Sequence, residues 1–339
     1  MRTAKLIDYN LKYLRRLSWG QLSRLAKSSL RSCLMADTLK ELFICPSHAC
    51  NADCMHCYEK FQHKKFAHSL RPAQVKQAID EFTKLGGQQV FFCSGEFLLR
   101  EDALEHIRYA RSRDLTVSIT SNGLLLDEAK IDALASAGLT RLILSIDSAD
   151  PARHDRLRGA PGCLEKVMAA VRMAKCKGLW VELWTYVSRS NAEGLDAISA
   201  LAENLGADIV FVFFPLLSGR FFDKPEENLS FEERESFRKR YNPSSNVLLE
   251  FPTERTLCRG GGKSHICVMP SGDVTFCPAV PYSYGKIGER SLRDCLADIR
   301  ADYRRFLPAC RGQCPVNSPD YRKGCSAQFM YKRDSEERP

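Results

Sequence analysis

Three cysteines follow the first apolar run of the chain within a single short segment. Cys50, Cys54 and Cys57 are separated by three and then by two residues. Thiolates at such short spacing allow one loop to supply several ligands to one iron–sulfur cube. Because three thiolates leave the fourth iron open, a substrate or cofactor can bind there. The segment therefore predicts a [4Fe-4S] cluster with one open coordination position.

Structural zinc is the alternative for the same thiols. A structural zinc site uses four Cys or His ligands around one ion. His56 stands between Cys54 and Cys57, where it is poorly placed to be the fourth ligand.

More cysteines gather near the C-terminus, in a region with little apolar periodicity. Residues 258 to 329 are rich in Cys, Gly and Pro, a composition typical of a small module held by metal. Residues 270–273 read Pro-Ser-Gly-Asp and predict a hairpin turn that brings Cys258 and Cys277 onto neighbouring strands. The other thiols of interest there are Cys310, Cys314 and Cys325.

A β/α rhythm between residues 41 and 215 supplies the scaffold for the first three thiols. Apolar, β-rich runs alternate with stretches of helical periodicity, which predicts parallel strands joined by right-handed crossovers. Six such units form an open α/β fold, a partial (β/α)6 TIM-like barrel, with ligands at the carboxyl ends of the strands. The expected strands are 42–45, 89–92, 115–119, 141–146, 181–187 and 208–214, and the expected helices lie near 73–85, 101–113, 127–137, 163–177 and 192–204.

Polar and glycine-containing segments follow these strands in order. Ser94-Gly95-Glu96 follows the second strand, and residues 120–123, Thr-Ser-Asn-Gly, follow the third. Ser145-Ile-Asp147 ends the fourth, with Arg158-Gly159 further on. Each segment alone is typical of a plain turn, but together they would line one edge of the sheet.

This order of motifs over residues 42 to about 215 resembles the radical S-adenosylmethionine (SAM) superfamily, with Phe97 in place of the family's proline and Ser94 in place of its first glycine. The resemblance implies a SAM-binding [4Fe-4S] cluster and reductive cleavage of SAM to a 5′-deoxyadenosyl radical. It also implies that Glu96 meets the methionine amine and that the strand around Val187 closes over the adenine. The remaining cofactor-binding residues that it implies are Tyr58 (alternatively a packed aromatic), Gly95, Ser121, Asn122, Ser145, Asp147 and Arg158.

The C-terminal module resembles the SPASM and twitch extensions of the superfamily, which carry auxiliary [4Fe-4S] clusters. Its first half matches, whereas the second half departs from the tighter family spacing. The resemblance implies at least one auxiliary cluster, held by Cys258, Cys277 and two of Cys310, Cys314 and Cys325. A zinc ribbon is the alternative.

The resemblance favours hydrogen abstraction from a peptide or peptide-like natural-product precursor. A small-molecule radical oxidoreductase acting on an amino sugar, lipid or isoprenoid and a non-catalytic metal-stabilised binding protein are the alternatives. Cys93, at the end of the second strand, is a candidate hydrogen donor to a substrate radical, although a buried structural cysteine is the simpler interpretation. A flavodoxin- or ferredoxin-type electron donor is implied, since no flavin or nicotinamide motif is visible.

The charge of the chain is concentrated at its start. The 339 residues carry a formal charge of +9, and residues 1–40 hold nine Lys or Arg against Asp8 and Asp37. Residues 20–35 form a basic amphipathic helix, expected to pack on the next domain or to touch a membrane surface. Nucleic acid is an unlikely partner, and the absence of long apolar runs favours a cytoplasmic location. We expect an N-terminal segment (1–40), a barrel (41–250) and an auxiliary-cluster domain (251–339).

Overall fold

The fold is that of a computed structural model, which describes residues 11–34, 39–59, 68–214, 220, 224–241, 246–249, 264–278, 282–306 and 328–329. Its main sheet has nine strands in the order β7-β6-β5-β4-β3-β2-β1-β8-β9, and every pair is parallel except β8 with β9. The strands are β1 (Glu41–Ile44), β2 (Gln89–Phe92), β3 (Thr116–Ser121), β4 (Arg141–Ser145), β5 (Trp180–Tyr186), β6 (Ile209–Phe213), β7 (Val247–Leu249), β8 (His265–Val268) and β9 (Val274–Thr275).

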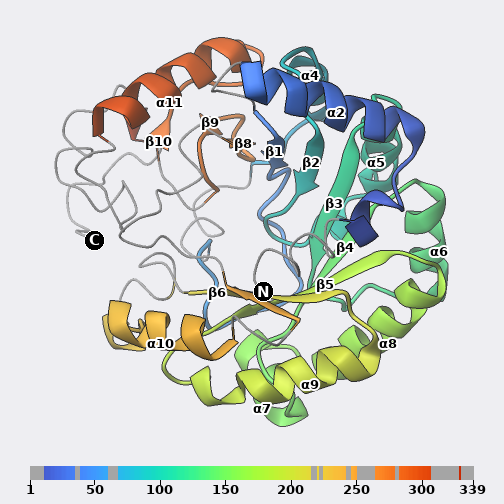
Figure 1. The fold of residues 1–339 in the computed structure, drawn as a ribbon, viewed down its shortest axis with the longest axis vertical. Helices are drawn as coiled ribbons and strands as arrows, with labels where there is room; N and C mark the ends of the chain where they lie inside the picture. Colours follow the sequence, from blue (N-terminus) through green and yellow to red (C-terminus); the bar gives the residue numbers. More distant parts are fainter. Residues whose placement is uncertain are drawn as a thin grey trace.

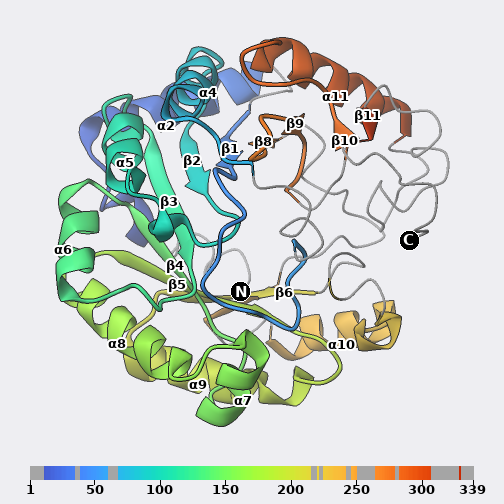
Figure 2. The same cartoon turned by 180° about the vertical axis from the view of Figure 1, so that it is seen from behind.

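Helices connect the parallel strands and cover the outside of the curved sheet (Figures 1 and 2). Asp127 begins α6 and Asp150 begins α7, each accepting a hydrogen bond from the backbone N–H three residues later at 2.7 Å. The helices of the barrel are α4 (Pro72–Lys84), α5 (Ala103–Arg111), α6 (Glu128–Ser136), α7 (Pro151–Arg158), α8 (Cys163–Cys176), α9 (Leu195–Leu205) and α10 (Phe231–Tyr241). The predicted open α/β barrel is confirmed, because the first and last strands of the sheet do not pair.

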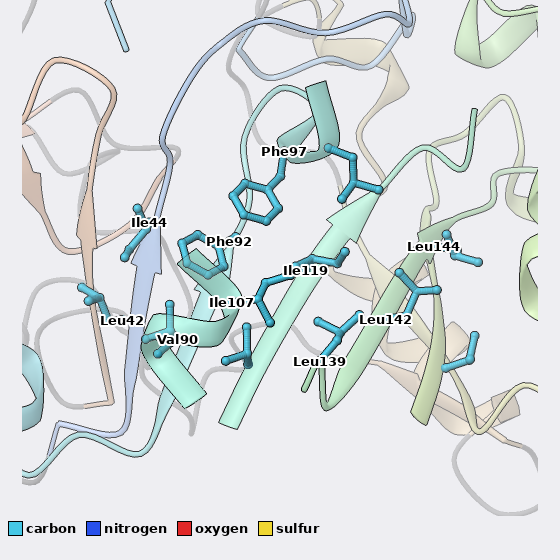
Figure 3. Packing of buried hydrophobic residues seen from close by; sticks show 14 of the residues in the cluster. Leu42, Ile44, Val90, Phe92, Phe97, Ile107, Ile119, Leu139, Leu142 and Leu144 are labelled. Atoms are coloured by element: carbon cyan, nitrogen blue, oxygen red, sulfur yellow. The ribbon is translucent and has the colours of Figure 1, made fainter. Parts of the chain in front are cut away.

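The two faces of the sheet bury different side chains, as the two-residue alternation of a strand requires. Leu42 and Ile44 of β1 and Val90 and Phe92 of β2 belong to the large core between sheet and helices (Figure 3). Cys45, Phe91, Cys93, Ile143, Cys267 and Met269 form a separate cluster on the inner face, with Phe43 and Trp184 packed against it. The outer face therefore stabilises the fold, and the inner face is left to line the site.

The N-terminal helix α2 (Trp19–Leu34) packs on the barrel at the end opposite the strand carboxyl ends. Gln21 is buried and donates to the Leu115 carbonyl at 3.5 Å, and Arg24 donates to the Gly87 carbonyl at 3.3 Å. Both acceptors lie just before strands β3 and β2. Among the described residues, no helix is long and apolar enough to cross a membrane.

The hairpin predicted at residues 270–273 is present between β8 and β9. Gly272 has a φ of +87°, a left-handed conformation that glycine adopts without a Cβ penalty. Because β8 pairs with β1, this hairpin extends the barrel sheet, which sequence analysis did not predict. Beyond it lie α11 (Leu292–Phe306) and the antiparallel pair β10 (Tyr282–Ser283) and β11 (Gln328–Phe329). Cys258, Cys310, Cys314 and Cys325 lie outside the described residues.

Candidate functional site

The cysteine loop follows β1 and lies against the end of α7. The backbone N–H of Asp53 donates to the Arg158 carbonyl at 3.0 Å, and that of Met55 donates to the Leu157 carbonyl at 2.8 Å. Two residues that sequence analysis placed in separate motifs, Cys54 and Arg158, are thereby adjacent. The thiols of Cys50, Cys54 and Cys57 are all half-buried.

Two glycines allow the close approach of neighbouring loops to this segment. Gly159 has a φ of +59°, and a Cβ added there would stand 2.6 Å from the Asp53 carbonyl oxygen. Gly95 has a φ of +55°, and its Cβ would stand 2.3 Å from the Ala49 carbonyl oxygen. Both distances are too short for real Cβ contacts, so a larger residue would push the cysteine loop away.

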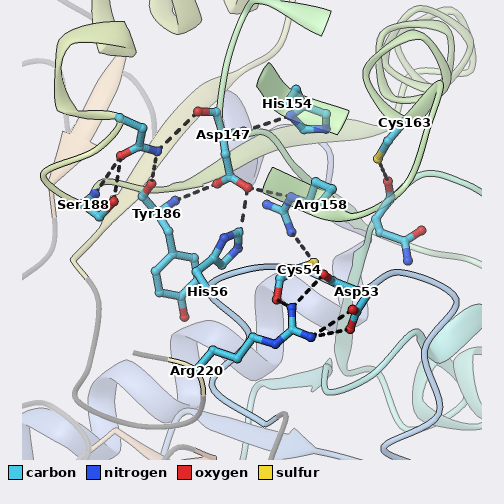
Figure 4. A network of polar contacts seen from close by, with 12 residues as sticks. Asp53, Cys54, His56, Asp147, His154, Arg158, Cys163, Tyr186, Ser188 and Arg220 are labelled. Atoms are coloured by element: carbon cyan, nitrogen blue, oxygen red, sulfur yellow. Dashed lines mark hydrogen bonds and ion pairs between the residues drawn. The ribbon is translucent and has the colours of Figure 1, made fainter. Parts of the chain in front are cut away.

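Arg220, which is distant in the sequence, also binds the cysteine loop. No sequence motif indicated this contact. Its guanidinium donates to both carboxylate oxygens of Asp53, at 2.8 and 2.9 Å, and to the Cys54 carbonyl at 2.9 Å (Figure 4). The Arg220 N–H also donates to the Cys57 carbonyl at 3.1 Å. The planar guanidinium of Arg220 thus holds the cysteine loop in one conformation through several hydrogen bonds.

A buried ion pair stands beside the loop. Arg158 Nε lies 2.6 Å from Asp147 Oδ2, and His56 Nε2 lies 3.6 Å from the same oxygen (Figure 4). Burial opposes ionisation of Asp147, but the charge of Arg158 outweighs it, so the pKa of Asp147 lies below its usual value. Asp147 also accepts a hydrogen bond from the Tyr186 N–H at 3.1 Å, which ties the pair to β5.

The donors around the sulfurs fit a thiolate-bound cluster. Arg158 Nη1 lies 3.7 Å from Cys54 Sγ, and Asn122 Nδ2 lies 3.9 Å from Cys50 Sγ. Burial raises the pKa of Cys50 to about 11 and that of Cys57 to about 12, so iron must displace a proton from each of these thiols when a cluster forms. Within the described ranges, no three His, Cys, Asp or Glu side chains surround a single-ion position. A cluster has a different requirement, since each thiolate binds its own iron.

Glu96, which follows β2, accepts hydrogen bonds from residues at the carboxyl end of β3. It is 2% exposed, and its Oε2 accepts hydrogen bonds from Ser121 Oγ at 3.1 Å and from the Asn122 N–H at 2.8 Å. Burial raises the pKa of Glu96 to about 7, although these hydrogen bonds oppose the rise. A cationic group beside it would favour the carboxylate, which is consistent with the role predicted for Glu96 toward the methionine amine.

The remaining predicted residues are placed less closely together. Ser145 ends β4 and is half-buried, whereas the Val187 side chain is 1% exposed in the outer core cluster. Burial raises the pKa of Tyr58 well above its usual value, and the charges of Cys45, Cys93 and Tyr186 contribute. The adenine roles of Tyr58 and Val187 stay predictions.

The two departures from the family motif differ in their structural consequences. Phe97, in place of proline, is 1% exposed and stacks on Phe92 with ring centroids 4.4 Å apart, so it fills the core. Ser94, in place of glycine, has a φ of +77° and therefore carries backbone strain that glycine would not.

The profile of the Radical SAM superfamily matches residues 44–201. The PqqA peptide cyclase of Gluconobacter oxydans is 30% identical over 247 residues, which cover 69% of this chain and 68% of that protein. The AdoMet-dependent heme synthase of Methanosarcina barkeri is 34% identical over 171 residues, covering 50% of this chain and 49% of the synthase. The chain thus spans about half the length of the heme synthases that it matches.

Solved structures show the same fold at low sequence identity. Streptococcus suis SuiB bound to its precursor peptide SuiA has a TM-score of 0.67 and 16% identity, over 87% of this chain and 76% of that chain. The anSMEcpe structure with bound AdoMet and Cp18Cys peptide has a TM-score of 0.62 and 15% identity, over 84% and 86%. With its cysteine loop, strand-end motifs and these matches, the chain belongs to the radical SAM superfamily.

Proposed function

We propose that this chain cleaves SAM reductively and abstracts a hydrogen atom from a peptide or peptide-like natural-product precursor. The observation that carries the proposal is the convergence of Cys50, Cys54, Glu96, Asn122 and Arg158 at the carboxyl ends of the strands. When bound, the SAM-ligated cluster supplies the electron that splits the sulfonium. The protein positions the cofactor and excludes water.

Each residue of the site has a proposed task. Cys50, Cys54 and Cys57 hold three irons. Glu96 receives the methionine ammonium, and Ser121 and Asn122 orient the Glu96 carboxylate. Arg158 keeps a positive charge beside the Cys54 sulfur, and Asp147 holds Arg158 in place at 2.6 Å. Gly95 leaves room for the cysteine loop, Ser145 and Tyr58 complete the cofactor pocket, and the strand end at Val187 closes over the adenine.

Several further assignments belong to the same proposal. At least one auxiliary [4Fe-4S] cluster is held by Cys258, Cys277 and two of Cys310, Cys314 and Cys325. A flavodoxin- or ferredoxin-type protein supplies electrons, and the enzyme works in the cytoplasm. The boundary near residue 250 separates the barrel from the auxiliary domain, with β8 and β9 shared between them.

The peptide substrate is favoured by the relatives. The PqqA peptide cyclase matches over more than two thirds of both chains. SuiB and anSMEcpe, which share the fold, were solved with peptides bound.

A tetrapyrrole or another flat, apolar small molecule is the second candidate substrate. The inner wall carries a continuous row of aromatic rings. The ring centroids of Phe43 and Phe91 lie 4.8 Å apart, Phe91 stacks on Trp184 at 5.4 Å, and the centroids of Trp184 and Phe213 lie 4.6 Å apart. Such a wall suits a flat ring system. The heme synthase of Methanosarcina barkeri is among the relatives.

The test is anaerobic reconstitution with iron and sulfide, reduction in the presence of SAM, and chromatographic assay for 5′-deoxyadenosine. We compare wild type with Cys54→Ala and with Cys176→Ala, which removes an exposed cysteine outside the loop. Product from wild type and Cys176→Ala alone, with roughly eight irons per chain, supports the proposal. No product from any protein, with tightly bound zinc instead, would indicate a metal-stabilised binding protein.

A further inference from the structure

Three cysteines form a buried thiol cluster on the inner face of the barrel, apart from the cysteine loop. Cys45 Sγ lies 3.6 Å from Cys93 Sγ and 3.6 Å from Cys267 Sγ. Cys45 follows β1, Cys93 follows β2 and Cys267 lies in β8, so three adjacent parallel strands bring them together. Their spacing in the sequence, 48 and 222 residues, gives no hint of this contact.

The position of the cluster links it to the proposed chemistry. Cys93 directly precedes Ser94-Gly95-Glu96, and Cys45 lies five residues before the first cluster ligand. The surrounding side chains are apolar and aromatic, namely Phe91, Ile143 and Met269, with Trp184 packed against them. A water-poor wall of this kind protects a carbon or sulfur radical from side reactions.

The three thiols differ in exposure, and Cys45 and Cys93 differ in pKa. Cys93 is 6% exposed, whereas Cys45 and Cys267 are fully buried, so Cys93 is the one that a bound molecule can reach. The sulfur contacts with Cys267 and Cys93 lower the pKa of Cys45 to about 6. Burial and the neighbouring Cys45 hold the pKa of Cys93 well above its usual value. Of the two sulfurs in contact, Cys45 is therefore the more acidic, and Cys93 is the one that keeps its S–H bond.

We infer that Cys93 returns a hydrogen atom to a carbon radical of the substrate. Cys45 is a positioning residue, whose sulfur contacts the Cys93 sulfur and stabilises it after the transfer. The inference rests on the proposed function and deepens it, because it assigns the site to reactions in which the substrate carbon regains hydrogen after abstraction.

The step balances in atoms and electrons. The S–H bond of Cys93 breaks homolytically and a C–H bond forms at the substrate radical, which leaves a thiyl radical on Cys93. The Cys45 sulfur, 3.6 Å away, stabilises that thiyl sulfur through its lone pair. One electron from the flavodoxin- or ferredoxin-type donor, with one proton from solvent, then restores the Cys93 thiol.

The first experiment follows deuterium. Full-length reconstituted protein is reduced with titanium(III) citrate and SAM in D2O, without substrate or added thiol, and the 5′-deoxyadenosine is analysed by mass spectrometry. In this uncoupled reaction the 5′-deoxyadenosyl radical itself takes the exchangeable hydrogen of Cys93. Wild type is expected to give product carrying a single deuterium, and Cys93→Ser product carrying none, since a hydroxyl bond is too strong to donate.

Cys295→Ser is the matched control, because Cys295 is also a buried cysteine but lies in α11, outside the thiol cluster. Its product should keep the deuterium. Deuterium retained in Cys93→Ser, or absent from wild type while 5′-deoxyadenosine forms, would overturn the inference and leave SAM cleavage standing. Absence of 5′-deoxyadenosine from every protein would overturn the proposed function and the inference with it.

The second experiment does not depend on turnover. The full chain, before reconstitution, is treated with the thiol oxidant diamide, alkylated and digested. A disulfide has an S–S distance of about 2.05 Å, so only thiols already in contact can form one without backbone movement. A peptide cross-linked between Cys45 and Cys93 is expected, whereas full alkylation of both thiols would overturn their partnership.

Discussion

Gly159 is the point at which the end of α7 meets the cysteine loop, so the Gly159→Ala variant tests how firmly that loop must be held. Alanine in the left-handed conformation costs about 1–2 kcal/mol. Gly162 provides a matched control, because it has a φ of +73° and no atom within 4 Å of an added Cβ. Gly162→Ala therefore carries the same backbone strain without the steric contact.

The additional effect at Gly159 follows from the contact distance. The new Cβ would lie 2.6 Å from the Asp53 carbonyl oxygen, whereas ordinary van der Waals contact begins at 3.4 Å. The cysteine loop must therefore move by roughly 0.8 Å, and misplacement by about 1 Å lowers rates about 100-fold. The hydrogen bond from the Asp53 N–H to the Arg158 carbonyl, worth about 1 kcal/mol, is weakened as well.

Three measurements compare the two variants. Chemical denaturation should show a loss of about 1–2 kcal/mol for Gly162→Ala and about 2–3 kcal/mol for Gly159→Ala. Iron content after reconstitution should stay near the wild-type value in both variants, so that a change in rate reports the displaced loop and not a lost cluster. Formation of 5′-deoxyadenosine should drop about 100-fold for Gly159→Ala and remain near wild type for Gly162→Ala. Equal losses of rate in both variants would refute the role of this contact.

Two further predictions concern buried carboxylates. The pKa of Glu96 is raised to about 7 by burial, so below that pH its carboxyl is protonated and cannot pair with an ammonium group. SAM affinity, measured by calorimetry, should therefore fall about tenfold per pH unit below 7 in wild type, and Glu96→Gln should bind weakly with no such slope. Glu182 is 1% exposed, lies 3.2 Å from Arg141 and accepts hydrogen bonds from Trp180 and Trp184. Glu182→Ala should lower the free energy of unfolding by about 3–5 kcal/mol in denaturant titration, because the half-buried Arg141 loses this ion-pair partner and the indole N–H groups of Trp180 and Trp184 lose their acceptor. A loss below about 1 kcal/mol would contradict that reasoning.

The membrane alternative for the N-terminal segment is tested by liposome flotation. The structure places Gln21 and Arg24 of α2 in contact with the barrel, which favours packing over lipid binding. Wild type and a variant with Leu22 and Leu25 both changed to Glu should therefore float to the same small extent. Flotation of wild type alone would restore the membrane interpretation.

Local sequence was sufficient for most of the barrel. The predicted helix at 163–177 is α8, Cys163–Cys176, and the predicted strand at 89–92 is β2. Periodicity succeeds here because each element buries one face, which fixes the spacing of its apolar residues. It missed α7, Pro151–Arg158, whose sequence is mostly charged and has no clear apolar face.

The candidate site also has parts that local sequence predicts and parts that only the tertiary structure shows. The sequence by itself was enough to predict Cys50, Cys54 and Cys57 as cluster ligands, because they lie in one contiguous segment and their spacing is read directly. Arg220, the buried Asp147–Arg158 pair and the thiol contacts of Cys45 with Cys93 and Cys267 were decided only by the tertiary structure. These contacts join residues far apart in the chain, and their geometry depends on which strands pair. The pairing of β8 with β1 depends on packing across the whole sheet, and no local pattern specifies it.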